Sequence, residues 1–161
     1  MIMTEEEREL LLKDLCARLP YGVKVYNTTF KDPTIQTLYG KISSDEFLME
    51  ETYTSVGING DDFGSFNKRH YTGYIDFIKP YLRPMSSMTE DEKKEYFSFI
   101  GGQKPFDSDF STYSKEYRFI YEWDVDNYVK WLHAHHFDYH RLIEKGLALE
   151  APEGMYNIKE K

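Results

Sequence analysis

The first twenty residues carry apolar side chains at steps of three and four, the spacing that places them on one face of an α-helix. The stripe consists of Leu11, Leu12, Leu15, Cys16 and Leu19. Thr4 and Glu7 match a capping box, in which the threonine hydroxyl and the glutamate carboxylate each accept a backbone N–H of the first turn. The pattern therefore predicts a helix that begins after Thr4 and ends before Pro20, because proline cannot continue a helix.

Between residues 21 and 78 apolar positions alternate with polar ones and with glycines, which is the period of β-strands. The alternating sets are Tyr21, Val23 and Val25; Leu38, Gly40 and Ile42; and Tyr71, Gly73, Ile75 and Phe77. Turn residues separate the strands, namely Asp32-Pro33, Ser43-Ser44-Asp45 and Asn59-Gly60. Four or five short strands are too few for two packed sheets, so we expect a small curved antiparallel sheet or open barrel.

Residues 78–89 separate this strand pattern from a helical one. Pro80 and Pro84 lack a backbone donor and bias the preceding residue toward extended geometry, so neither period should continue through this segment. Thr89 and Glu92 then match a second capping box. They predict a short helix that ends at Gly101-Gly102. Its apolar positions are Tyr96, Phe97 and Ile100.

Two further helices are expected near the C-terminus, one capped by Asp124 and one by Asp138. Their stripes are Val125, Tyr128, Val129 and Leu132 for the first, and Tyr139, Leu142 and Ile143 for the second. The alternation of Tyr117, Phe119 and Tyr121 favours another strand. We therefore expect an α+β protein with an N-terminal helix, a small sheet and a helical C-terminal half. Residues 1–84 would form the helix-and-sheet lobe, and residues 85–161 a mainly helical lobe that shares its core.

Composition limits the classes of function. The chain has 161 residues, of which 40% are apolar and 30% charged, as in a globular protein with its own core. The formal net charge of −8 argues against a nucleic-acid partner, because affinity for phosphate backbones comes from Lys and Arg. Aromatic residues reach 17%, with 14 tyrosines, which suits either a shallow core or a recognition face.

A single cysteine, Cys16, excludes an internal disulfide and a zinc site built of several cysteines. Because it lies in the apolar stripe, we interpret it as a small buried hydrophobe rather than a nucleophile. The N-terminal segment is acidic where a signal peptide would be basic and then apolar. No apolar run approaches the roughly 20 residues that span a bilayer. We therefore expect a cytoplasmic protein with no membrane partner.

The candidate chemistry is a group of four histidines, namely His133, His135, His136 and His140. On one continuous helix, His133, His136 and His140 would lie within an arc of about 60°, where imidazoles can bind zinc, nickel or copper. Phe137-Asp138 is instead typical of a helix break with a new N-cap, which would turn His140 away. Only Asp138 or Glu144 could add a carboxylate. We therefore assign no metal site and no cofactor, and keep metal binding as the alternative.

The remaining polar residues give no catalytic set. His70 stands alone in a strand and is interpreted as a residue of the sheet surface. The acidic pairs Glu50-Glu51 and Asp61-Asp62 are interpreted as charged turns, because neighbours in a strand point to opposite faces. Asp107-Ser108-Asp109 begins like a calcium loop, but the EF-hand register requires Gly at Thr112 and Glu at Arg118. Neither a triad nor a glycine-rich phosphate loop is present, so no catalytic residue is assigned.

Three segments together resemble a family of short proteins from gut Bacteroidetes genomes and their phages or mobile elements. They are residues 11–24 (LLKDLCARLPYGVK), 78–92 (IKPYLRPMSSMTEDE) and 132–157 (LHAHHFDYHRLIEKGLALEAPEGMYN). The resemblance implies an origin of this kind and no particular activity. His135 and His136 match the family pattern, whereas His133 and His140 depart from it, which weakens the metal interpretation.

The leading hypothesis is a non-enzymatic protein-interaction module of phage or mobile-element origin with a protein partner. Its basis is the missing catalytic set and the many tyrosines, which favour recognition surfaces. A contiguous exposed aromatic patch on the sheet would support it. The alternative is a metal-binding protein or metal-dependent enzyme that uses residues 133–140. A weaker alternative is nucleic-acid binding by a small barrel through aromatic stacking.

Overall fold

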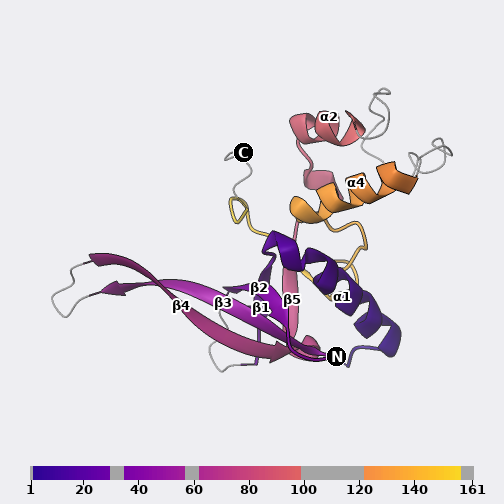
Figure 1. Ribbon diagram of the computed structural model, residues 1–161. Helices are drawn as coiled ribbons and strands as arrows, with labels where there is room; N and C mark the ends of the chain where they lie inside the picture. The colour runs from indigo at the N-terminus through magenta and orange to yellow at the C-terminus, as the bar shows by residue number, and fades with distance from the viewer. Residues whose placement is uncertain (1, 30–34, 57–61, 99–121, 157–161) are drawn as a thin grey trace.

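The computed structural model describes residues 2–29, 35–56, 62–98 and 122–156 (Figure 1). The elements in chain order are α1 (Glu5–Arg18), η1 (Leu19–Tyr21), β1 (Lys24–Asn27), β2 (Ile35–Lys41), β3 (Glu46–Val56), β4 (Asp62–Tyr74), η2 (Ile75–Phe77), β5 (Ile78–Leu82), η3 (Met85–Ser87), α2 (Glu90–Ser98), α4 (Glu122–Ala134) and β6 (Leu149–Glu150). The expected α+β architecture is confirmed, with an N-terminal helix, an open sheet and later helices.

The sheet has six strands in the order β4-β3-β2-β1-β5-β6 and does not close into a barrel. All neighbours are antiparallel except β5 and β6, which pair in parallel, so the sheet is mixed. The parallel pair joins the C-terminal segment to β5. Figure 1 shows β3 and β4 extending beyond the other strands as a twisted two-stranded ribbon.

The N-terminal helix follows the sequence prediction. Glu7 N–H donates to the Thr4 hydroxyl at 3.2 Å, and Thr4 N–H donates to the Glu7 carboxylate at 2.8 Å, which completes the capping box. Leu11 and Leu15 are fully buried. The helix ends at Arg18, and Pro20 lies in the following 3-10 turn, where its missing N–H costs no helical hydrogen bond.

The segment that separates the strand and helical patterns differs from its prediction. The expected strand face through Tyr71, Gly73, Ile75 and Phe77 is wrong, because β4 ends at Tyr74 and Ile75–Phe77 forms a 3-10 turn. β5 then lies inside the sheet although it contains Pro80. Thr28 N–H donates to the Phe77 carbonyl at 2.8 Å, so two-residue alternation makes the Val25–Pro80 pair a non-hydrogen-bonded one. The proline therefore removes no hydrogen bond to β1.

Two groups of buried apolar side chains form the interior. The first, which we call the sheet core, consists of Leu11, Leu15, Val23, Val25, Leu38, Phe47, Met49, Ile75, Ile78, Leu82, Leu142, Leu147 and Ala148. The second, the helix core, consists of Met88, Tyr96, Trp131, Leu132 and Phe137. The sheet core joins α1 and the C-terminal segment to one side of the sheet, whereas the helix core lies between α2 and α4.

Two predictions near the C-terminus are wrong. Asp124 lies inside α4 rather than at its N-cap, since the helix already includes Glu122. The helix expected after Asp138 is replaced by turns, because Arg141 adopts a left-handed conformation with φ of 58°. The Asp138 carboxylate still accepts the backbone N–H groups of Leu142 and Ile143, at 2.8 and 2.9 Å.

The last described turn is tied to the sheet. The Tyr156 hydroxyl accepts the N–H of Lys24 in β1 and donates to the carbonyl of Tyr81 in β5, each at 2.8 Å. It thereby bridges two strands at their ends. Several predictions lie outside the described residues, namely the turns at Asp32-Pro33 and Asn59-Gly60, the helix end at Ile100 to Gly102, Asp107-Ser108-Asp109, and the strand at Tyr117 to Tyr121.

Candidate functional site

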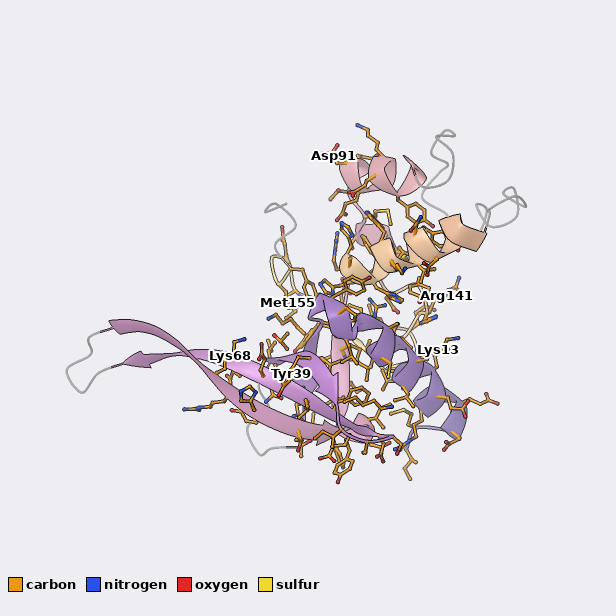
Figure 2. The ribbon with its side chains drawn as sticks, in the orientation of Figure 1. Lys13, Tyr39, Lys68, Asp91, Arg141 and Met155 are labelled. Carbon is orange, nitrogen blue, oxygen red and sulfur yellow. The ribbon has the colours of Figure 1, made fainter. Side chains whose placement is uncertain are left out.

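One side of the sheet carries apolar and aromatic side chains that stay accessible to solvent. Residues that alternate with those of the sheet core point to this side, which we call the open face. Its apolar members are Tyr26, Ile35, Tyr39, Leu48, Tyr74 and Tyr81. Ile35, Tyr39 and Tyr74 are 48%, 41% and 47% exposed, and the other three are half-buried. Figure 2 shows Tyr39 and Lys68 on the sheet, and Lys13 on the neighbouring helix α1.

A bulge and a glycine in β2 determine how two open-face residues, Tyr39 and Leu48, are positioned. The β2–β3 register shifts between Leu38 and Gly40, so Tyr39 is an extra residue that lies over the sheet. Its hydroxyl lies 3.1 Å from Nδ1 of His70. A Cβ on Gly40 would lie 3.1 Å from Leu48 Cδ1, so glycine lets Leu48 pack closely against β2. The arrangement joins β2, β3 and β4 through side chains on one surface.

The open face continues over β1 and β5. Tyr26 pairs with Ile35 across β1 and β2, and its ring meets that of Tyr81 edge to face at 6.5 Å between centroids. Burial, together with the neighbouring Tyr26, raises the pKa of Tyr81 above its usual value. The face therefore runs from β5 to β4 with tyrosines at both ends.

The four predicted histidines do not share a helix face. α4 ends at Ala134, and His136 follows in the left-handed conformation with φ of 62°. Phe137 N–H donates to the Leu132 carbonyl at 3.0 Å and His136 N–H to the His133 carbonyl at 3.1 Å, which is a Schellman ending. The predicted helix break is confirmed, since α4 ends before Phe137-Asp138 and His140 is therefore not on the same helix as His133.

Each imidazole is engaged with neighbouring protein groups. Nε2 of His133 lies 2.8 Å from the Tyr139 hydroxyl, Nδ1 of His135 lies 2.9 Å from the Trp131 carbonyl, and His136 stacks on Tyr156 at 3.7 Å. The Trp131 carbonyl can only accept, so Nδ1 of His135 carries its proton. Among the described residues no group of three or more His, Cys, Asp or Glu side chains is placed to hold a metal ion.

A buried ion pair lies beside these histidines and was not predicted. Arg18 donates to both oxygens of Asp14, at 2.7 and 3.0 Å, and both side chains are fully buried. Arg18 also donates to the Phe137 carbonyl at 2.7 Å, and Nδ1 of His140 lies 3.1 Å from Asp14. Burial acts to raise the pKa of Asp14, but hydrogen bonds from His140 and Arg18 and the charge of Arg18 hold it below its usual value.

The environment of the pair also affects its neighbours. Burial, and next the charge of Arg18, lowers the pKa of His133 to about 4, so this imidazole is neutral near pH 7. Burial, and next the charge of Asp14, raises the pKa of Tyr139 to about 12. An aspartate bonded to a histidine is a usual part of acid-base sites. Here the carboxylate is fully buried against Arg18, so its contacts are those of a structural ion pair that joins α1 to the C-terminal segment.

A second charged pair holds α2 against the end of β5. Arg83 donates to both carboxylate oxygens of Glu92, at 2.8 and 2.9 Å, and lies 4.3 Å above the Phe137 ring. Glu92 also accepts the N–H of Thr89 at 2.9 Å, which confirms the second capping box. Burial acts to raise the pKa of Glu92, but the bonds from Arg83 and Thr89 lower it overall. The Arg83–Glu92 ion pair therefore connects the end of β5 to α2 and is a part of the fold.

The other sequence candidates have ordinary places. Cys16 is half-buried and packs against the sheet core, so its apolar packing is confirmed but its full burial is not. His70 is an exposed residue of β4, as expected. Glu50 and Glu51 lie within β3, so the prediction of a charged turn is wrong. Glu50 accepts from Lys68 on the open face and Glu51 from the Tyr71 hydroxyl on the other side, both at 3.0 Å.

The remaining sequence candidates and the comparisons with known proteins assign no further functional residue. Asp62 begins β4, whereas Asp61 lies outside the described residues. Within the described parts of the chain, no helix is long and apolar enough to cross a membrane. Comparisons with protein-family models, with curated proteins and with solved structures found no match for this chain.

Proposed function

We propose that this protein is a non-enzymatic protein-interaction module that binds its partner through the open face of the sheet. The observation that carries the proposal is that Ile35, Tyr39 and Tyr74, each more than two-fifths exposed, lie on the same surface of the sheet. Single exposed apolar residues are normal in folded proteins, whereas a group rimmed by polar residues marks interaction sites.

The chemistry of the open face suits protein recognition. Tyrosine is enriched at the centres of interfaces because it buries a large apolar ring and keeps a hydroxyl for hydrogen bonds. The face carries Tyr26, Tyr39, Tyr74 and Tyr81, and the Lys68–Glu50 ion pair lies among them, with Glu50 on β3 between β2 and β4. Protein–protein interfaces commonly combine aromatic side chains with charged and hydrogen-bonding ones.

The histidine cluster gives the alternative less support. A metal site needs lone pairs that point at one position. Nε2 of His133, Nδ1 of His135 and Nδ1 of His140 point instead at Tyr139, Trp131 and Asp14. Their contacts explain these histidines as parts of the fold.

The proposal is tested by purifying tagged protein from its own host after nuclease treatment, with three forms side by side. The wild type is compared with the double variant Ile35→Ser/Tyr39→Ser, which removes two exposed apolar side chains from β2. The matched control is Ile2→Ser, because Ile2 is 96% exposed and lies outside the sheet. Circular dichroism checks that all three forms are folded.

A partner that binds the open face is retained at constant stoichiometry by the wild type and by Ile2→Ser and is lost from the double variant. Its direct binding to the purified protein is then measured by calorimetry. A partner retained by all three forms would contradict the open face as the binding surface. Elemental analysis of the wild type, with about one metal ion per chain in place of a partner, would favour the alternative.

A further inference from the structure

β4 leaves one long side of its backbone without a strand partner among the described residues. It is the terminal strand in the sheet order and has 13 residues, whereas β6 at the opposite edge has 2. An edge strand of this length presents a row of N–H and C=O groups to which another extended segment can pair.

The direction of these groups follows from the β3–β4 register. Ile75 N–H donates to the Asp45 carbonyl at 2.8 Å, and the register continues from there with Glu46 opposite Tyr74. Because backbone groups in an antiparallel pair alternate between facing the partner strand and facing away, every second residue of β4 points outward. These residues are Lys68, His70, Thr72 and Tyr74.

The outward residues also belong to the open face, since side chains and backbone directions both repeat every two residues. Thr72 lies opposite Leu48, and His70 contacts Tyr39. A strand added to β4 would therefore extend the open face, with its own alternate side chains beside Thr72 and Tyr74. The edge and the face form one continuous binding surface.

The charge along the edge indicates the chemistry of the added strand. Lys68 and Arg69 are successive exposed cations of this edge, in a chain whose formal net charge is −8. Lys68 bonds Glu50 of β3 at 3.0 Å, yet its side chain stays 55% exposed and can meet a second carboxylate. A second copy of this chain that paired symmetrically about the middle of β4 would set Lys68 opposite Lys68, and like charges placed opposite each other are destabilising. Acidic side chains at these positions would be attracted instead.

We infer that β4 accepts an extended acidic segment of a partner protein as an additional antiparallel strand. The segment would place β-branched or aromatic residues opposite Thr72 and Tyr74 and carboxylates opposite the run from Lys68 to His70. This inference rests on the proposed function and specifies its partner and its mode of binding.

The probe is a synthetic peptide, acetyl-Val-Thr-Val-Thr-Glu-Asp-Glu-amide, added to ¹⁵N-labelled full-length protein. We expect amide signals of β4 to shift on titration up to about 1 mM peptide, and the shifts to weaken at high salt. The matched peptide with Lys-Arg-Lys in place of Glu-Asp-Glu should bind at least tenfold more weakly. No shift with the acidic peptide, or equal shifts with both, would overturn the inference.

Two variants test the mode of binding. Thr72→Pro removes an outward N–H while leaving the bonds to β3, and edge strands tolerate proline at such positions. We expect a tenfold or larger loss of peptide affinity, whereas Thr72→Val should bind like the wild type. Lys68→Glu should reverse the preference between the two peptides. Unchanged peptide binding by Thr72→Pro would overturn strand addition.

The same variants separate this inference from the proposed function. If the host partner is lost from Ile35→Ser/Tyr39→Ser but kept by Thr72→Pro, strand addition is wrong and the open face remains the binding surface. If both variants keep the partner, both proposals are wrong. If sedimentation finds a wild-type dimer that Thr72→Pro abolishes, the edge pairs with a second copy and the acidic partner is overturned.

Discussion

The two faces of the sheet differ in what covers them. On one face Val25, Leu38 and Met49 are fully buried beneath α1 and the C-terminal segment. On the open face the alternate residues of the same strands include Ile35 and Tyr39, which remain 48% and 41% exposed. The strands thus carry apolar side chains on both faces, but the described residues bury only one.

This difference separates folding from function. Folding stability explains why apolar residues occupy the covered face, because each buried apolar side chain contributes roughly 1.5–3 kcal/mol to stability. The exposed residues of the open face contribute far less, so folding alone does not explain why tyrosines and Ile35 occupy it. Substitutions on the two faces should accordingly separate stability from binding.

The largest effect is expected where charge is buried beside the covered face. Asp14→Ala leaves Arg18 charged and fully buried without its carboxylate, which should cost about 3–5 kcal/mol of unfolding free energy. Urea denaturation followed by circular dichroism measures the loss. The control Asp91→Ala removes an acid whose side chain is 97% exposed, and should change stability by less than about 0.5 kcal/mol.

A double variant identifies the cause of that loss. Asp14→Leu/Arg18→Met replaces both charges with apolar side chains, and such replacements are often close to neutral. The double variant should therefore be more stable than Asp14→Ala. A double variant as unstable as the single one would mean that the bonds to Phe137 and His140, rather than the uncompensated charge, determine the cost.

The second prediction compares neighbouring residues of β3 that point to opposite faces. Met49→Ala should cost about 2–5 kcal/mol, because Met49 is fully buried in the sheet core and truncation leaves a cavity. Leu48→Ala, on the open face, should cost less than about 1 kcal/mol. Urea midpoints measured on both variants make the comparison. Equal losses would mean that the open face is as tightly packed as the covered one.

Sequence patterns predicted the elements whose signals are local. Thr4 with Glu7 and Thr89 with Glu92 each form a capping box within four residues, so the motif is complete in the sequence. Although Tyr21 lies in η1 and not in a strand, the alternation in β1 and β2 likewise indicated strands. It could not indicate which alternate set would be covered, because that depends on where α1 and residues 142–148 pack.

Features that depend on distant contacts were missed. Asp14 and Arg18, four residues apart on a helix, have the spacing of an exposed ion pair, and only contacts from Phe137 and His140 bury them. The stripe after Asp138 has helical spacing, but Arg141 breaks it while Asp138 holds the following turn. The spacing of side chains shows which residues share one face of a helix or strand. It does not show which other segments of the chain pack against that face.

The third prediction concerns pH and the neutral His133 beside the buried pair. In the unfolded chain a histidine takes up a proton below about pH 6.5, whereas folded His133 stays neutral until its pKa of about 4. The unfolded state therefore binds more protons in this interval, and stability falls as the pH is lowered from about 6.5 to 4. The loss should reach at most about 3 kcal/mol.

Urea unfolding of the wild type and His133→Phe at pH 7 and at pH 4.5 measures this contribution. The variant should lose less stability between the two pH values, because it has no imidazole to protonate at this position. From about pH 5 downward the lowered pKa values of Asp14 and Glu92 add a loss of the same sign in both proteins. Equal losses down to pH 4.5 would place the titrating group elsewhere.

The smallest effect on stability is expected on the open face. Each substitution in Ile35→Ser/Tyr39→Ser should change the unfolding free energy by about 0.5 kcal/mol or less, because both side chains are more than two-fifths exposed. Loss of the Tyr39 contact with His70 adds little, since that contact is itself exposed. The same double variant should lose its partner completely. A large loss of stability with binding intact would reverse the comparison, making the open face a part of the folded interior and leaving the partner to bind elsewhere.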